Sequence, residues 1–106
     1  MADTLEALKE TDIQAAILEY LRLKGRFFWR NNSGAFKTER GGFYRIGTPG
    51  APDIIGCFHR TFVGLEVKTA TGKLSDDQKA FAAVVRANGG QYHVVRSIDD
   101  VISLGL

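Results

Sequence analysis

Cysteine is almost absent from this sequence, with Cys57 the only one among 106 residues. A single thiol excludes an internal disulfide and a zinc site built on several cysteines, and it gives no reason to expect an oxidising compartment. We expect Cys57 to be a small buried apolar side chain. The two histidines, His59 and His93, have no neighbouring ligand pattern, so neither is assigned to a metal.

Long hydrophobic runs are also missing. The longest apolar stretches fall far short of the roughly 18 residues of a membrane-spanning helix, and residues 1–10 lack the basic start and apolar run of a secretory signal. We therefore expect a cytoplasmic protein with no membrane partner. Hydrophobic residues make up 44% of the chain and charged residues 25%, as in ordinary globular domains, so we expect one folded domain over 1–106.

The net charge is small, at +2, but it is unevenly distributed. Residues 22–45 contain seven lysines and arginines and one acidic residue, which gives +6 there and −4 elsewhere. A basic segment with interleaved aromatic residues suits a nucleic acid, because neutralised phosphates release counterions and bases stack on aromatic rings. The alternative is a set of ordinary strands whose basic and aromatic residues face solvent and core in turn.

Two amphipathic helices are predicted from the spacing of apolar residues. The first covers 11–24, where Thr11 and Gln14 have the spacing of a capping box and Gly25 provides a left-handed end. The second follows Ser75 as its N-cap and has acidic residues in its first turn. Its inner face is predicted to carry Phe81, Val84 and Val85.

Strands are predicted where β-branched and aromatic residues cluster, at 26–32, 52–58, 61–69 and 91–97. Glycines punctuate a further hairpin and loop between residues 33 and 50. A short helix follows the last strand. The order α-β-β-β-α-β-α, with the extra hairpin, predicts an α/β fold. Its mixed β-sheet is flanked by helices on both faces, because a strand-helix-strand unit needs a crossover.

The strands at 52–58 and 61–69 are predicted to pair antiparallel through a two-residue turn at His59 and Arg60. In that register Asp53 lies opposite Glu66, with Cβ atoms on the order of 5 Å apart, which is unfavourable for two carboxylates alone. Period-two alternation puts Lys68 on the same face. A three-residue turn would instead shift the pairing by one residue and separate the acids.

Two facing carboxylates suit a hard divalent ion such as Mg²⁺ or Mn²⁺, which takes oxygen ligands and keeps waters that a substrate phosphate can displace. A lysine beside them would stabilise developing negative charge. The pattern is therefore typical of metal-assisted phosphodiester hydrolysis. The alternative is structural, with Glu66 and Lys68 as an ordinary ion pair on a strand and Asp53 as a turn residue after Pro52.

These residues also carry a resemblance to a known family. From about residue 10 to the C-terminus, the sequence resembles the VRR-NUC family of the PD-(D/E)xK nuclease superfamily. Pro-Asp and Glu-x-Lys are moderately specific, and the segment that follows makes the resemblance strong. The motifs that match are Gly50-Ala51-Pro52-Asp53, Glu66-Val67-Lys68, Gly72-Lys73-Leu74-Ser75 with Gln78, Gly89-Gly90 and Val94-Val95-Arg96-Ser97.

The resemblance implies a restriction-endonuclease-like fold and a DNA endonuclease that depends on Mg²⁺ or Mn²⁺. It implies that Asp53 and Glu66 bind the metal together with the backbone carbonyl of Val67, and that Lys68 is the catalytic lysine. Members of this minimal size, often viral or bacterial, resemble four-way junction resolvases that act as homodimers. Branched or duplex DNA and a second copy are therefore the expected partners, without a small-molecule cofactor.

Two further residues match the family's motifs. Gln78 either touches the catalytic site or is the N3 residue of the Ser75 capping box, and it could do both. Glu10 matches the acidic residue of the first helix, where it would add a ligand to a metal or water. The alternative for Glu10 is a solvated helix start shared with Glu6 and Asp12.

Contacts to the DNA backbone are expected from basic residues, namely Arg30, Lys37, Arg40, Arg45 and Lys73. Trp29 either wedges at a branch point or packs in the core or in a dimer contact. The rival function is a non-catalytic DNA-binding module that uses the basic segment. A third hypothesis keeps the nuclease but assigns it flap cutting or nicking within a larger replication or packaging complex.

Overall fold

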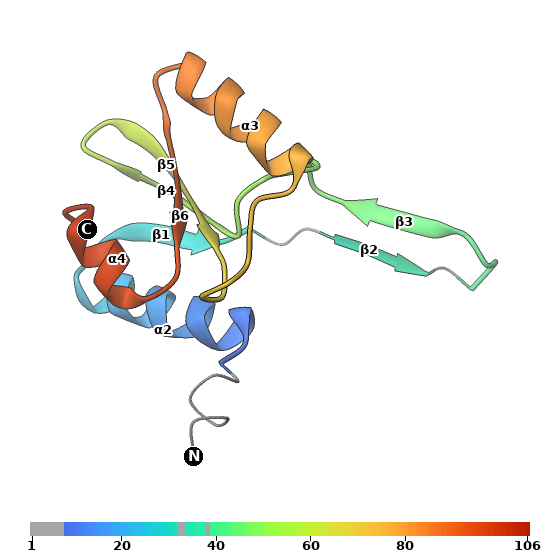
Figure 1. The fold of residues 1–106 in the computed structure, drawn as a ribbon, viewed down its shortest axis with the longest axis horizontal. Coiled ribbons are helices and arrows are strands. Elements are labelled where there is room, and N and C mark those ends of the chain that lie inside the picture. The colour runs from blue at the N-terminus through green and yellow to red at the C-terminus, as the bar shows by residue number, and fades with distance from the viewer. Residues whose placement is uncertain (1–7, 32–33, 38) are drawn as a thin grey trace.

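The computed structural model describes residues 8–31, 34–37 and 39–106, and of residues 34–37 and 43–46 it describes the backbone alone (Figure 1). The elements in chain order are α2 (Glu10–Leu23), β1 (Phe27–Arg30), β2 (Gly34–Lys37), β3 (Phe43–Ile46), β4 (Ile54–Phe58), β5 (Thr61–Val67), α3 (Asp76–Ala87), β6 (Gln91–Val95) and α4 (Ile98–Ser103). The predicted α/β order with an inserted hairpin is therefore confirmed.

The main sheet has the strand order β1-β4-β5-β6. β1 pairs with β4 and β4 with β5 in antiparallel fashion, whereas β5 and β6 are parallel, since the chain crosses over through α3. The hairpin of β2 and β3 forms a separate two-stranded sheet. It projects from the end of the main sheet where β1 stops and β4 begins (Figure 1).

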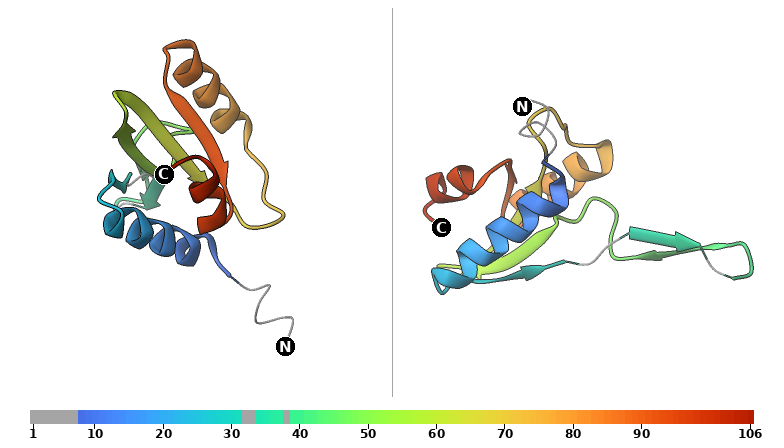
Figure 2. Two further views of the ribbon diagram at one scale, coloured as in Figure 1. Left: turned by 90° about the vertical axis from the view of Figure 1, so that its left-hand side faces the viewer. Right: turned by 90° about the horizontal axis from the view of Figure 1, so that it is seen from below.

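The hydrophobic core lies between one face of the main sheet and two helices. α2 and α4 cover that face, and α3 lies across the sheet from them (Figure 2). The helical spacing of Ile17 and Leu21 brings both side chains onto Ile54, Leu65 and Val67. Alternate residues of β4 and β5 thus face this core, and the residues between them face the side of the sheet on which α3 packs.

The turn between β4 and β5 has the predicted two residues. His59 and Arg60 have positive φ angles of 49° and 66°, as the central residues of a type I′ hairpin turn require. Phe58 consequently pairs with Thr61, and Ile54 pairs with Leu65. The register on which the facing carboxylates depend is confirmed.

Three expectations for single residues were wrong. α2 begins at Glu10, with Lys9 as its N-cap, because the Asp12 carboxylate accepts a hydrogen bond from the Lys9 N–H at 3.3 Å. Thr11 therefore lies inside the helix. Val84 is 63% exposed, since α3 turns Ala82 toward the sheet instead. Cys57 is exposed because no described helix covers its part of the sheet.

The N-cap of α3 is the residue that the sequence predicts. Ser75 is the N-cap of α3, as predicted, and its hydroxyl accepts from the Gln78 N–H. Within the described residues no helix has the length and apolar content needed to cross a bilayer.

Candidate active site

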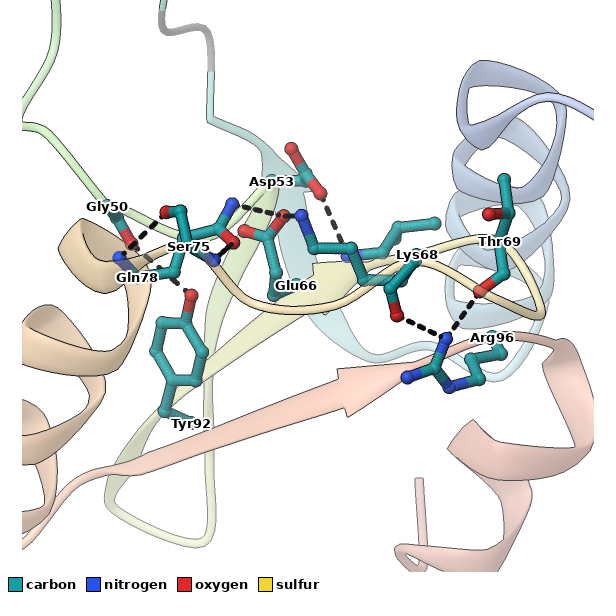
Figure 3. Close-up of polar contacts among 11 residues, drawn as sticks. Gly50, Asp53, Glu66, Lys68, Thr69, Ser75, Gln78, Tyr92 and Arg96 are labelled. Atoms are coloured by element: carbon teal, nitrogen blue, oxygen red, sulfur yellow. Dashed lines mark hydrogen bonds and ion pairs between the residues drawn. The ribbon is translucent and has the colours of Figure 1, made fainter.

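Asp53 and Glu66 meet at the end of the β4–β5 hairpin. Extending the pairing of Ile54 with Leu65 by one residue places Asp53 opposite Glu66 on the face that does not pack on α2. On its other side Asp53 is fixed to the continuation of β1, because the Asn31 N–H donates to the Asp53 carbonyl at 2.8 Å. Figure 3 shows the two carboxylates side by side, with Lys68 next to Glu66.

Pro52 interrupts the backbone ladder between β4 and β5 just before Asp53. The register places Pro52 opposite Val67, at a position where an antiparallel ladder would exchange two backbone hydrogen bonds. Proline has no N–H to donate to the Val67 carbonyl. The Val67 N–H instead donates to the Asp53 side chain at 2.8 Å, and the Pro52 carbonyl accepts from the Asn31 side chain at 3.1 Å. The carboxylate of Asp53 is thereby held at the edge of β5.

Glu66 is a buried carboxylate with incomplete hydrogen bonding. Its residue is 2% exposed, the only buried charged residue in the described part of the chain. The Oε2 atom accepts from Gln78 Nε2 at 3.0 Å and lies 3.7 Å from Lys68 Nζ. The Oε1 atom is buried without a hydrogen-bond partner. An unsatisfied buried acceptor of this kind is costly, and a bound water or cation would satisfy it.

The electrostatics of Glu66 agree with this geometry. Burial and then the negative charge of Asp53 raise the pKa of Glu66, with a smaller raising contribution from Glu10 and a lowering one from Lys68, to about 8 in all. The nearby lysine therefore does not compensate fully for desolvation and for the second carboxylate. A divalent cation between the two acids would supply that compensation.

Gln78 has both roles that the sequence left open. Its side-chain oxygen accepts from the Ser75 N–H at 2.9 Å, and its backbone N–H donates to the Ser75 hydroxyl at 3.2 Å, which completes the capping box. Its side-chain nitrogen donates to Glu66. The cap of α3 thus fixes the orientation of one candidate metal ligand.

Gly50 and Tyr92 hold the loop before Asp53 against the start of α3. The sequence did not predict this role for either residue. Gly50 has φ +82°, and a Cβ atom there would lie 2.1 Å from the Asp77 carbonyl, so only glycine lets this loop approach the start of α3. The buried Tyr92 hydroxyl donates to the Gly50 carbonyl at 3.3 Å (Figure 3). Burial, and then the charges of Glu66 and Asp53, raise the pKa of the Tyr92 phenol.

Arg96 fixes the loop that follows Lys68. Its guanidinium donates to the carbonyls of Thr69 and Gly72, at 2.9 Å in the second case (Figure 3). This arginine belongs to a matching motif, but no pattern in the sequence assigned it a contact. It holds the chain between Lys68 and the start of α3 in one conformation.

Glu10 is the first residue of α2 and is partly buried. Its negative charge makes the smallest contribution to the raised pKa of Glu66. Gln14, one turn further along, is also partly buried. Among the described residues, no hydrogen bond or ion pair joins Glu10 to Asp53 or Glu66, and its role as a further ligand stays a prediction.

The donor set fits a hard divalent ion. No group of three or more histidine, cysteine, aspartate and glutamate side chains forms a metal site within the described residues. The oxygens that lie together are instead those of two carboxylates, Asp53 and Glu66, with the free Oε1 atom of Glu66 among them. Oxygen ligands of this kind suit Mg²⁺ or Mn²⁺, which retain several waters and need few protein ligands.

The predicted DNA contacts are only partly described. Arg30, Arg40 and Lys73 are exposed. Lys37 and Arg45 belong to β2 and β3, but their side chains lie outside what the structure describes. Arg30 is the last residue of β1 and pairs with Ile54, so it lies on the face of the sheet opposite to Asp53.

Comparison with known families agrees with the motifs. The family model of the VRR-NUC domain matches residues 8–99. The matched segment begins just before α2 and includes Asp53, Glu66, Lys68 and Gln78. No curated protein matches the chain.

Proposed function

The chain belongs to the VRR-NUC domain family, a nuclease family of the PD-(D/E)xK superfamily, and from that membership we propose that it is a metal-dependent DNA endonuclease. The proposed cofactor is Mg²⁺ or Mn²⁺. The proposed substrates are branched DNA molecules, four-way junctions among them, and the proposed active form is a homodimer. A symmetric pair of sites would serve the two strands of a branched substrate, which one small domain serves poorly.

One observation carries the proposal. Glu66 is buried, has an oxygen atom without a partner and faces a second carboxylate. A structural ion pair would be expected to satisfy both oxygens and to keep the pKa of the acid low. Here the pKa of Glu66 is raised, so the positive charge of Lys68 does not balance the burial of Glu66 and the negative charge of Asp53. A cation-binding site accounts for it.

The proposed roles follow from the contacts. Asp53 and Glu66, with the Val67 carbonyl, would hold the ion, which when bound would polarise a phosphoryl oxygen and lower the pKa of a bound water. Gln78 orients the Glu66 carboxylate through its 3.0 Å hydrogen bond. The Lys68 ammonium, 3.7 Å from Glu66, would stabilise negative charge on the reacting phosphate.

The test compares a four-way junction, a flap and a linear duplex of matched sequence, each with Mg²⁺, Mn²⁺ or EDTA. We expect cleavage with either metal, none with EDTA, and paired symmetric nicks in the junction. Asp53→Asn and Glu66→Gln should each lower cleavage by about 100-fold or more without weakening DNA binding. Asp99→Asn, at an exposed acid of α4, is the matched control and should cut like the wild type.

Absence of metal-dependent cleavage on every substrate, with the protein folded, would refute the proposal. The rival DNA-binding module would then be favoured if Arg40→Glu abolished DNA binding while Lys68→Ala changed nothing. Cleavage of flaps in preference to junctions would instead favour the third hypothesis, a nuclease that trims or nicks within a larger complex.

A further inference from the structure

The face of the sheet that carries Asp53 and Glu66 is covered only in part. α3 packs against β6 at one edge, where the rings of Phe81 and Tyr92 lie 6.1 Å apart. Within the described residues, no helix other than α2 makes an extensive contact with β1 or β4, and α2 lies on the opposite face. The part of the site face that β1 and β4 form is therefore open.

Two aromatic side chains of β1 lie on this open area. Phe27 is 69% exposed and Trp29 is 45% exposed, and their ring centroids are 5.1 Å apart. The register pairs Phe27 with Cys57 and Trp29 with Ile55, and residues 53, 55 and 57 share a face. The aromatic pair and the Asp53 carboxylate thus face the same side. Trp29 is not a core residue.

Trp29 also lies close to Asp53. The hydrogen bond from Asn31 to Asp53 continues the register of β1 with β4, so Trp29 and Asp53 are diagonal neighbours across the two strands. Diagonal neighbours on one face are about 7–8 Å apart at Cα, within reach of an aromatic side chain. A group stacked on Trp29 would therefore lie next to a phosphate bound at Asp53.

We propose that Trp29, backed by Phe27, stacks on an unpaired nucleobase of the DNA strand that is cut. The inference rests on the proposed nuclease function and narrows its substrate to DNA in which a base beside the cleaved bond is free. Bases within a duplex are already stacked on each other, whereas a base splayed out at a branch has a free face. The aromatic pair would thus select branched or single-stranded regions over linear duplex.

Charge and position favour a nucleic acid over a second protein copy. Trp29 lies within residues 22–45, the segment that carries a net charge of +6. Such a segment attracts phosphates and repels its own copy. A second copy seated on Trp29 would also cover its diagonal neighbour Asp53, to which the substrate needs access.

Trp29 is the sole tryptophan of the chain, so its fluorescence reports on this position alone. The experiment titrates the Asp53→Asn variant, which should bind without cutting, with a flap duplex and with a fully paired duplex of equal length and sequence. We expect the flap DNA to quench the fluorescence strongly and the paired duplex to leave it nearly unchanged. Quenching by neither, while both DNAs bind, would overturn the proposal.

Binding measurements on substitutions give an independent reading. Trp29→Ala should weaken binding of the flap DNA about 5- to 100-fold and leave binding of the paired duplex within about twofold, whereas Trp29→Phe should retain most of the affinity. Ile102→Ala is the control, since this α4 side chain is 50% exposed on the opposite face. An equal loss for both DNAs, or no loss with Trp29→Ala, would refute base stacking.

The outcomes separate this inference from the proposed function. Quenching by flap DNA without any cleavage by the wild type would sustain stacking and refute the nuclease. Cleavage by the wild type with no quenching, and with full activity in Trp29→Ala, would sustain the nuclease and refute stacking. Fluorescence that changes with protein concentration alone, together with a doubled mass in sedimentation, would assign the aromatic pair to a dimer contact and overturn the proposal.

Discussion

Replacing Glu66 by glutamine should stabilise the metal-free protein at alkaline pH. The glutamine amide keeps the shape of the side chain and an acceptor for Gln78, and it removes the charge that burial and Asp53 disfavour. Its amino group can also donate to Asp53, which the carboxylate cannot. The Glu66→Gln variant therefore retains the contacts of the site without its electrostatic cost.

The size of the effect follows from the pKa of Glu66, which rises from the ordinary value of 4.5 to about 8 on folding. Between those two pH values the folded protein binds the proton and the unfolded chain does not, so the free energy of unfolding falls as pH rises. The slope is about 1.4 kcal/mol per pH unit for one proton. Above pH 8 the total loss would be roughly 3–5 kcal/mol, a large share of the stability of a small domain.

The assay is urea unfolding of the wild type and of Glu66→Gln in EDTA from pH 5 to 9, followed by circular dichroism. The difference between the two free energies of unfolding should grow with pH and level off above pH 8. Mg²⁺ at pH 8 should restore stability to the wild type and not to the variant, because ligand binding stabilises the folded state. Glu19→Gln, at an exposed glutamate, is the control and should give a difference that does not vary with pH over this range.

A difference that stays constant within about 0.5 kcal/mol from pH 5 to 9 would refute the reasoning. It would mean that Glu66 ionises in the folded protein as easily as in the unfolded chain. The carboxylate pair would then be adequately compensated by Lys68 and Gln78, and the argument for a bound cation would lose its main support.

Two further pairs of substitutions test the framework of the site. Gly50→Ala should lower the free energy of unfolding by at least about 2 kcal/mol in urea titrations, since its Cβ atom would lie 2.1 Å from the Asp77 carbonyl, whereas Gly25→Ala, at φ +73° with open space, should cost about 1 kcal/mol. Gln78→Ala and Ser75→Ala should each cost about 1 kcal/mol through the cap. Only Gln78→Ala should also lower kcat on DNA, by about 10- to 100-fold, because it alone frees the Glu66 carboxylate.

The position of Asp53 opposite Glu66 could be predicted because it depends on short-range rules. A two-residue turn at His59 and Arg60 fixes the pairing of β4 with β5, and the pairing brings Asp53 opposite Glu66. The order of elements follows from apolar spacing in the same way. Ser75 was identified as a cap because capping needs only four consecutive residues.

Burial on the site face could not be predicted, because it depends on how far α3 extends over the sheet. Alternation along β1 and β4 assigns each residue to a face and does not say what covers that face. Cys57 was therefore expected inside and lies outside, and core packing, one of the alternatives left open for Trp29, is excluded by its exposure. The contacts of Tyr92 and Arg96 were missed for a related reason, since both join segments that are distant in sequence.

The same uncovered area also gives the active site its access. A helix extended over β1 and β4 would bury Trp29 and would close the approach to Asp53 along the sheet, leaving the carboxylate pair with no path for a DNA strand. With α3 confined to the β6 side, Glu66 is shielded by Gln78 on one side while Asp53 stays half-buried on the other. One carboxylate is thus dehydrated, as the proposed cation site requires, and its partner borders an open surface that the proposed substrate could use. Exposure of Trp29 is therefore expected of any arrangement in which this edge cuts DNA.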